Sequence, residues 1–201
     1  MNSPACTNRT SPRTRTSLGG WKSSALGAAA VAALLGTMTG EASAAEGPGT
    51  ANTVAACTAD ALTVSATTEP TDDTEARHLL ITARNVGDKE CALYRHPRIR
   101  LGADARTTVP VIEDSDPDPG VPVTLAPGAK AYAALLVSGG ARDVYEAKSI
   151  TLGLQGRTPG STASGPIDVP LPVDTLYADD GQLVTYWTTA SGFALDFIMS
   201  K

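Results

Sequence analysis

Short runs of alternating apolar and polar residues recur along the chain from residue 62 onward, separated by turns rich in proline and glycine. Residues 149–154 read Ser-Ile-Thr-Leu-Gly-Leu, and this period of two is typical of a β-strand with one buried face. No run after residue 57 sustains the 3.6-residue period of an amphipathic helix. The pattern therefore predicts β-strands as the main secondary structure.

Ten such runs are expected to form strands. They are residues 62–65, 78–86, 99–101, 107–112, 121–125, 131–137, 149–154, 167–173, 183–187 and 194–199. Residues 131–137 also have helix propensity, but they follow the Pro127-Gly128 turn closely, which favours a strand. Many short strands with turn signals at regular spacing predict an all-β fold, an antiparallel β-sandwich.

The N-terminal part of the chain has the layout of a secretory signal peptide. Residues 1–24 carry four basic residues and no acidic one. Residues 25–38 are an uncharged apolar run, too short to span a ~30 Å hydrocarbon core. Ala42-Ser43-Ala44 supplies the small residues that a signal peptidase reads, so cleavage is predicted after Ala44, with Ala45 as the neighbouring choice. A buried Ala-rich helix of a cytosolic protein is the competing interpretation.

The predicted organisation is a signal peptide over residues 1–44, a flexible lead-in over residues 45–56 and a single domain over residues 57–201. Val54-Ala55-Ala56-Cys57 resembles the lipobox of a bacterial lipoprotein. A lipobox directly ends the apolar run, however, whereas about fifteen residues intervene here. We therefore expect a secreted, extracellular protein with no lipid anchor and no membrane span in the mature chain.

Export would change the charge of the protein. The full chain has 16 basic and 21 acidic residues, and loss of four basic residues and Glu41 with the signal leaves a net charge of −8, with both histidines neutral. Nucleic-acid binding relies on Lys and Arg that displace counterions from phosphate, so a nucleic acid is not an expected partner. The net negative charge also disfavours adsorption to anionic lipid.

Two cysteines, Cys57 and Cys91, remain once Cys6 leaves with the signal. In an exported protein the default for two cysteines is one disulfide. It would close a loop of about 34 residues, which stabilises by roughly 3–4 kcal/mol in the chain-entropy account. A free thiol pair and a Cys₂His₂ zinc site with His78 and His96 are the alternatives, although the close ligand spacings of such a site are missing.

Four groups of residues carry a resemblance to a known family. They are Cys57 with Leu62; Asn85-x-Gly87-x₃-Cys91-x-Leu93-x₃-Pro97-x-Ile99-x-Leu101; Thr124-Leu125-x-Pro127-Gly128-x₂-Ala131; and Trp187. On these residues the chain resembles an actinobacterial family of secreted and lipoprotein-borne domains, catalogued as a domain of unknown function (number 4232). The resemblance implies an Ig-like β-sandwich with Cys57 and Cys91 paired, and it supplies no activity and no catalytic residues.

The chain departs from the pattern of that family in two places. Members usually carry glycine two residues before the proline, where this chain has Arg95, so the backbone conformation of this loop is an open question. Residues 188–201 extend past the usual end of the domain.

Candidate catalytic residues are sparse. A serine nucleophile needs a base, and the histidines available are His78, in a predicted strand, and His96, in a turn before Pro97. No Gly-x-Ser-x-Gly motif supplies a nucleophile elbow. Glycosidase carboxylates need a cleft and aromatic platforms for the sugar, and aromatic residues are few. We expect no enzyme activity and no cofactor, which makes a hydrolase a distant alternative.

An acidic segment, residues 113–120, places Asp114, Asp116 and Asp118 at alternate positions, as the opening of a Ca²⁺ loop does. An EF-hand needs Gly at the sixth place and Glu at the twelfth, but counting from Asp114 these are Pro119 and Leu125. A solvated acidic loop is favoured, and the three aspartates are at most a weak metal-site candidate.

A cationic stripe is the least expected local feature of this acidic chain. It comprises Arg95, His96, Arg98 and Arg100, with Arg106 further on. Arg98 and Arg100 flank Ile99, so both face outward if Ile99 faces the core. A guanidinium group fits phosphate or carboxylate, which makes the stripe a candidate face for an anion or a partner. The alternative is an ordinary exposed strand face paired with Asp and Glu on a neighbouring strand.

The sequence thus predicts a secreted, monomeric, non-catalytic binding module of the cell envelope or the extracellular space. Its expected partner is an anionic envelope polymer or an acidic secreted protein. The alternative function is that of a secreted inhibitor or structural partner of another protein.

Overall fold

The computed structural model describes residues 53–201, so the predicted signal peptide and most of the predicted lead-in lie outside the described residues. The strands are β1 (Leu62–Thr68), β2 (His78–Asn85), β3 (Cys91–Leu101), β4 (Val123–Leu125), β5 (Lys130–Leu136), β6 (Tyr145–Ala147), β7 (Ile150–Gln155), β8 (Ile167–Val169), β9 (Leu176–Ala178) and β10 (Leu183–Val184). The helical elements are the 3₁₀ turns η1 (Ala59–Ala61) and η2 (Glu113–Ser115) and the α-helix α1 (Ser191–Asp196). The predicted all-β class is confirmed.

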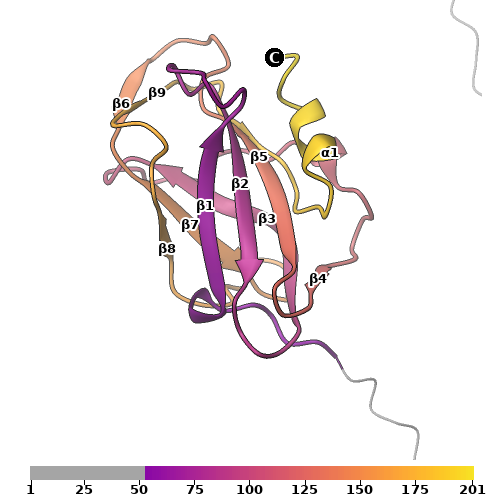
Figure 1. The fold of residues 1–201 in the computed structure, drawn as a ribbon. Helices are drawn as coiled ribbons and strands as arrows, with labels where there is room; N and C mark the ends of the chain where they lie inside the picture. The colour runs from indigo at the N-terminus through magenta and orange to yellow at the C-terminus, as the bar shows by residue number, and fades with distance from the viewer. Residues whose placement is uncertain (1–52) are drawn as a thin grey trace, which may run out of the picture. The chain divides into compact units, whose positions relative to one another are not determined.

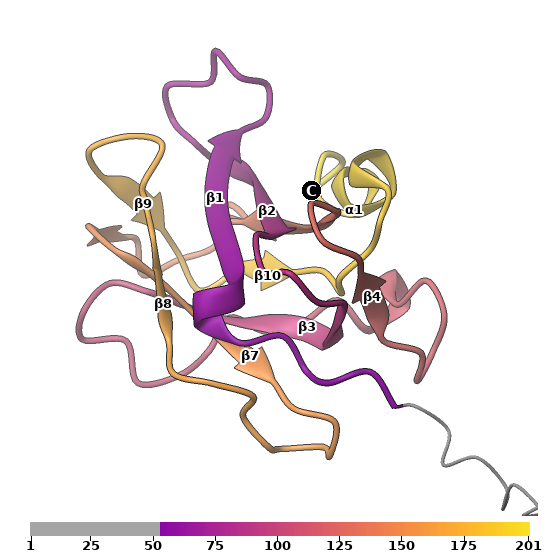
Figure 2. The ribbon, with the colours of Figure 1, turned by 60° about the horizontal axis from the view of Figure 1, so that its bottom comes forward.

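The strands form two four-stranded antiparallel sheets, in the orders β1-β2-β5-β10 and β4-β3-β7-β8. Strands β6 and β9 pair separately as a two-stranded antiparallel ribbon. In Figure 1, β3 and β7 pass behind β1, β2 and β5 and run across them, and Figure 2 shows the same two layers from below. The two larger sheets therefore face each other as the layers of a sandwich.

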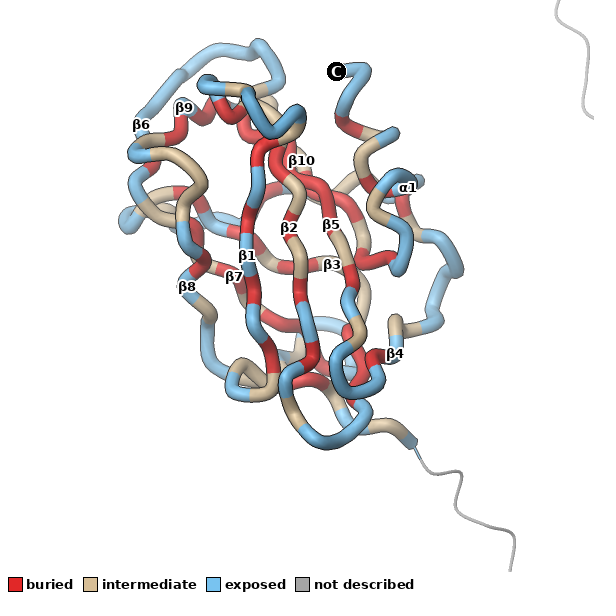
Figure 3. Tube along the Cα trace, in the orientation of Figure 1, coloured by how far each residue is buried: buried red, intermediate tan, exposed pale blue. Residues whose placement is uncertain are grey.

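The core between these layers comes from the alternation that the sequence shows. Along β1 every second residue is buried, beginning with Leu62 and Val64, and β2 buries Leu79, Ile81 and Ala83 in the same way. Figure 3 shows this alternation of buried and exposed positions along β1 and β2. Side chains on one face of a strand repeat every second residue, so the register of each pair places the apolar set on the inner face.

Cys57 and Cys91 form a disulfide, with their Cα atoms 4.8 Å apart, as predicted. The bond ties the start of the domain to β3 and closes a loop of 34 residues, so it removes roughly 3–4 kcal/mol of chain entropy from the unfolded state. Backbone hydrogen bonds from Cys57 to Ala92 (2.9 Å) and from Ala92 to Ala55 (2.8 Å) extend this attachment. Because both sulfur atoms are bonded to each other, neither the free thiol pair nor the zinc site is formed.

The prediction of a strand over residues 194–199 is wrong, because this segment contains the second half of α1 and the turn after it. Ala194 and Ile198 are four residues apart and pack on Ala134 and Leu136, which lie on the outer face of β5. This second small core covers the sheet from the side opposite the main core. The apolar residues of the segment fit either period, and the uncovered face of β5 selects the helix. Within residues 53–201, no helix is long and apolar enough to cross a membrane.

Two further differences concern short elements. Residues 107–112 form an isolated bridge between Val111 and Val184 rather than the predicted strand, because Pro110 has no N–H for a ladder of hydrogen bonds. Strands β6 and β9 were not expected. Tyr145, Glu146 and Tyr177 are exposed, so this ribbon carries little of the apolar alternation that marks a strand in a sequence.

A buried carboxylate, Asp179, joins the end of β5 to the turn before β10. It accepts hydrogen bonds from the Ser138 hydroxyl (2.7 Å) and from the backbone N–H groups of Gly139, Ala141 and Gly181 (2.9 Å each). The turns meet so closely that a Cβ atom on Gly139 would lie 2.6 Å from the Gly181 carbonyl oxygen. Burial alone would raise the pKa of Asp179, but these four hydrogen bonds favour the ionised form, and the pKa is lowered overall.

We predict that Asp179→Asn destabilises the protein by about 1–3 kcal/mol at neutral pH, because the amide has one acceptor oxygen instead of two and its NH₂ group cannot accept from the donors that now bond to the other oxygen. A carboxylate whose pKa is lowered in the folded state contributes stability above its unfolded pKa of about 3.9, and this contribution is lost as the pH falls toward the folded pKa. Urea denaturation from pH 7 to pH 2 should therefore show a weaker acid dependence for the variant. Asp180→Asn, at the exposed neighbour, is the matched control. Equal acid dependence of the parent and Asp179→Asn would contradict this role.

Candidate functional site

Three arginines of the predicted stripe converge on one groove, together with hydroxyl side chains from two other segments. This arginine groove has a volume of about 300 Å³. Its polar side chains are Arg98, Arg100, Arg106, Thr108, Thr162 and Ser164. The groove lies on the outer face of the β4-β3-β7-β8 sheet and brings together β3, the segment after it, and the β7–β8 loop.

The position of the arginines follows from the register of β3. Ile99 is fully buried and pairs with Leu152 of β7, so its neighbours Arg98 and Arg100 point to the other face, as expected. Arg98 lies opposite Gly153, which has no side chain to fill the floor beside the guanidinium stem.

The guanidinium groups of the groove have few partners within residues 53–201. Lys148–Glu146, with 3.7 Å between Nζ and Oε2, is the one ion pair in this part of the chain, so no arginine here is paired with a described carboxylate. Arg98 Nη2 lies 3.5 Å from Gln155 Oε1, a long contact. Asp168 faces the same side but lies two strands from Arg100 in register, a backbone separation of about 9–10 Å at the usual strand spacing. The alternative of a strand face paired with neighbouring acids is not what the structure shows.

Arg95 does not line the groove, although the prediction grouped it with the other arginines. Its backbone φ angle is +56°, in the left-handed region that favours glycine, and the β3–β7 register shifts between Tyr94 and Arg98. The guanidinium Nη1 and Nη2 donate to the carbonyls of Gly156 and Arg157, both at 3.0 Å. Arg95 therefore stabilises a β-bulge. The backbone conformation at this position, where family members usually carry glycine, is left-handed in this chain although the residue is arginine.

His96 is also separate from the groove. Its ring is 5.2 Å from that of Tyr186 in an edge-to-face arrangement, and the Tyr186 hydroxyl donates to Glu113 Oε2 at 2.8 Å. Burial lowers the pKa of His96, and the charges of Arg98 and Arg95 lower it further against the opposing effect of Glu113. Burial and Glu113 raise the pKa of Tyr186 to about 12. His96 is therefore neutral at neutral pH and adds no charge to the stripe.

The acidic segment does not assemble a ligand set. Asp114 lies in η2, and Asp116 accepts a hydrogen bond from the Asp118 backbone N–H at 3.3 Å through its Oδ1 atom. No group of three or more His, Cys, Asp or Glu side chains in the described part of the chain is arranged to hold a metal ion. The three aspartates remain, on this geometry, exposed or half-exposed residues of a loop.

These features define an all-β domain of two facing sheets, with a disulfide at its start and an arginine-lined outer face. Residues 57–188 match the family described as Domain of unknown function (DUF4232), so the chain belongs to this family, as the motifs predicted. No curated protein and no solved structure matches the chain. The matched region ends before α1 and so leaves the helix as an extension beyond it.

Part of the groove was not predicted from the sequence. Thr108, Thr162 and Ser164 contribute hydroxyl groups, and the latter two lie more than fifty residues from Arg98 in the chain. No local motif marks them, since single Ser and Thr residues are common in loops. The Ser164 hydroxyl also accepts a hydrogen bond from the Ala59 backbone N–H at 3.0 Å, which holds this loop against the start of the domain.

Arg95 and Arg100 should differ in their effect on stability. Arg95→Ala loses two charge-assisted hydrogen bonds to backbone carbonyls and keeps the unfavourable backbone conformation, so we predict a loss of about 1–3 kcal/mol in urea denaturation. Arg95→Gly should be about 1 kcal/mol more stable than Arg95→Ala, because glycine tolerates the left-handed region. Arg100→Ala, at an exposed position, is the control and should change stability by less than about 0.5 kcal/mol. A loss for Arg100→Ala as large as that for Arg95→Ala would contradict this assignment.

Proposed function

We propose that this protein is a secreted, non-catalytic binding module with an Ig-like sandwich fold, and that the arginine groove binds an anionic polymer of the cell envelope. The observation that carries the proposal is the convergence of Arg98, Arg100 and Arg106 on one groove without a described carboxylate partner. Three like charges at one place repel each other, so folding stability gives no reason to gather them. A bound anion would remove that repulsion.

The chemistry of the groove fits phosphate or carboxylate groups. A guanidinium offers a planar pair of N–H donors that matches the oxygen atoms of either group, and hydroxyl groups such as those of Thr108 and Thr162 add neutral donors. The groove is open to solvent, which leaves room for the neighbouring units of a repeating polymer. Lys and Arg contacts to a polyanion also release counterions, so binding should weaken as salt increases.

Secretion is supported by two independent features. The N-terminal sequence has the order of basic, apolar and small residues that a signal peptide requires. The Cys57–Cys91 disulfide is of a kind that persists in oxidising compartments. The same disulfide occupies the sulfur atom that a lipid anchor on Cys57 would need, which agrees with a protein released into the extracellular space.

The double variant Arg98→Ala, Arg100→Ala tests the proposal. We predict that it binds purified teichoic acid at least about tenfold more weakly than the parent and with a smaller dependence on salt, because two of three cationic contacts are lost. Its melting temperature should stay within about 2 °C of the parent value. Co-sedimentation with peptidoglycan that retains or lacks its teichoic acid gives the same comparison on whole envelope material.

Arg84→Ala, Arg142→Ala is the matched control, because both residues are exposed and the net charge changes equally. Equal binding by the two double variants would show that the overall charge, and not the groove, holds the polymer. If the parent binds an acidic secreted protein through the same arginines but no envelope polymer, the proposed ligand is wrong and the partner is a protein.

A further inference from the structure

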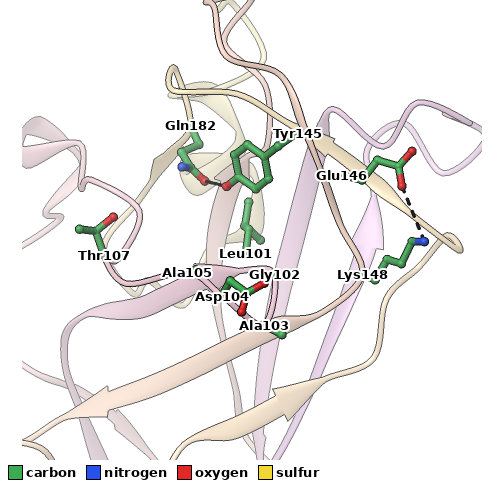
Figure 4. Close-up of a pocket in the computed structure, with 10 residues that line it drawn as sticks. All are labelled: Leu101, Gly102, Ala103, Asp104, Ala105, Thr107, Tyr145, Glu146, Lys148 and Gln182. Carbon is green, nitrogen blue, oxygen red and sulfur yellow. Dashed lines mark hydrogen bonds and ion pairs between the residues drawn. The ribbon is translucent and has the colours of Figure 1, made fainter.

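A second concave site lies beside the arginine groove and has no role in the function proposed above. It is a cleft of about 510 Å³ between the segment after β3, strand β6 and the residue directly before β10. This volume lies within the range of small-molecule sites in proteins. Figure 4 shows the side chains that line it, with Tyr145 joined to Gln182 by a hydrogen bond and Glu146 paired with Lys148.

One wall of the cleft is a flat aromatic ring. Tyr145 is 37% exposed, unlike most large apolar side chains of the domain, whereas Leu101, which also lines the cleft, is buried. The Tyr145 hydroxyl donates a hydrogen bond to Gln182 Oε1 at 3.2 Å, a long contact that joins the two side chains across the cleft wall. The turn next to Gln182 is held in place by the four hydrogen bonds that Asp179 accepts, so the backbone on this side of the cleft is well constrained.

Polar groups around the ring are available for a ligand. Gln182 uses its oxygen toward Tyr145, which leaves the Nε2 amide hydrogens as donors. Asp104 is exposed and pairs with no described cation, so its carboxylate can accept hydrogen bonds. The Thr107 hydroxyl can donate or accept. Glu146 is already paired with Lys148, at 3.7 Å, which reduces the charge that this wall offers to a ligand.

We propose that this cleft binds one ring of a neutral sugar. A sugar ring has an apolar face of C–H groups that packs on an aromatic side chain, and a rim of hydroxyl groups that both donate and accept hydrogen bonds. Tyr145 supplies the flat apolar surface, and Asp104, Thr107 and Gln182 supply acceptors and donors at its edge. An anion is not the fitting ligand, because Asp104 would repel it.

The cleft and the arginine groove share one segment of the chain. Arg100, Arg106 and Thr108 line the groove, whereas Leu101 and Thr107, their neighbours in sequence, line the cleft. Residues 101–108 therefore separate a site for an anionic group from a site for a neutral ring. The sugar site does not depend on the groove, and either can be present without the other.

The experiment is a titration of the ¹⁵N-labelled protein with neutral trisaccharides, namely chitotriose, cellotriose and maltotriose, followed by NMR. We expect at least one of them to shift the Gln182 side-chain amide and the backbone amides of Gly102 and Ala105 at millimolar concentration. Tyr145→Ala should weaken that binding at least about fivefold, since it removes the stacking surface. Asp104→Asn should weaken it less and leave the fold unchanged, because the residue is exposed.

Tyr177→Ala is the matched control, because Tyr177 is an exposed tyrosine of the same ribbon, in β9, and does not line this cleft. The proposal is overturned if no neutral trisaccharide shifts these resonances, or if Tyr145→Ala and Tyr177→Ala weaken binding equally. It is also overturned if shifts appear only with anionic sugars. We expect the double variant Arg98→Ala, Arg100→Ala to bind the neutral trisaccharide as the parent does, which would show that the sugar site is distinct from the arginine groove. Loss of polymer binding in the same variant would concern the groove alone and would not count against the sugar site.

Discussion

The burial of one face of β3, which is kept across its β-bulge, is the constraint on which the arrangement of the arginines depends. Arg95 occupies the left-handed region, and its guanidinium holds the carbonyls of Gly156 and Arg157. The carbonyls of the bulge are bonded as well, since that of Arg95 accepts from the Trp187 N–H (2.9 Å) and that of His96 from Gln155 Nε2 (2.8 Å). The register shifts by two residues between Tyr94 and Arg98, an even number, so the alternation of faces is the same on both sides of the bulge. Leu93 and Ile99 are therefore both inside, and Arg98 and Arg100 are outside.

The residues of the cationic stripe have different roles in the structure. The Arg95 guanidinium bonds to backbone carbonyls of the fold, and burial beside Tyr186 lowers the pKa of His96 and keeps it neutral. The charges that remain for a ligand are those of Arg98, Arg100 and Arg106, all on one groove. The stripe thus divides into Arg95, which stabilises the fold, and a cationic groove formed by the other three arginines. Because the chain has a net negative charge, this groove differs in charge from the rest of the protein.

The elements that the sequence predicted well are those whose apolar pattern agrees with their final environment. Residues 78–86 and 149–154 alternate and are strands with one buried face, and the Cys57–Cys91 pair follows from the count of cysteines. The helix over Ser191–Asp196 could not be predicted in this way, because its apolar residues fit both periods and its partner is the outer face of β5, far away in the chain. The cleft beside Tyr145 was missed for a similar reason, since its walls come from three segments and carry no motif.

The most direct measurement of the central claim, that three arginines form one anion site, is an NMR titration of the arginine Nε–Hε signals with inorganic polyphosphate. The account predicts that the signals of Arg98, Arg100 and Arg106 shift together and saturate with one affinity. Arg95 and Arg77 should change little, because their guanidinium groups already donate to backbone carbonyls. Shifts that spread equally over all exposed arginines, including Arg84 and Arg142, or that spare Arg98 and Arg100, would contradict the account.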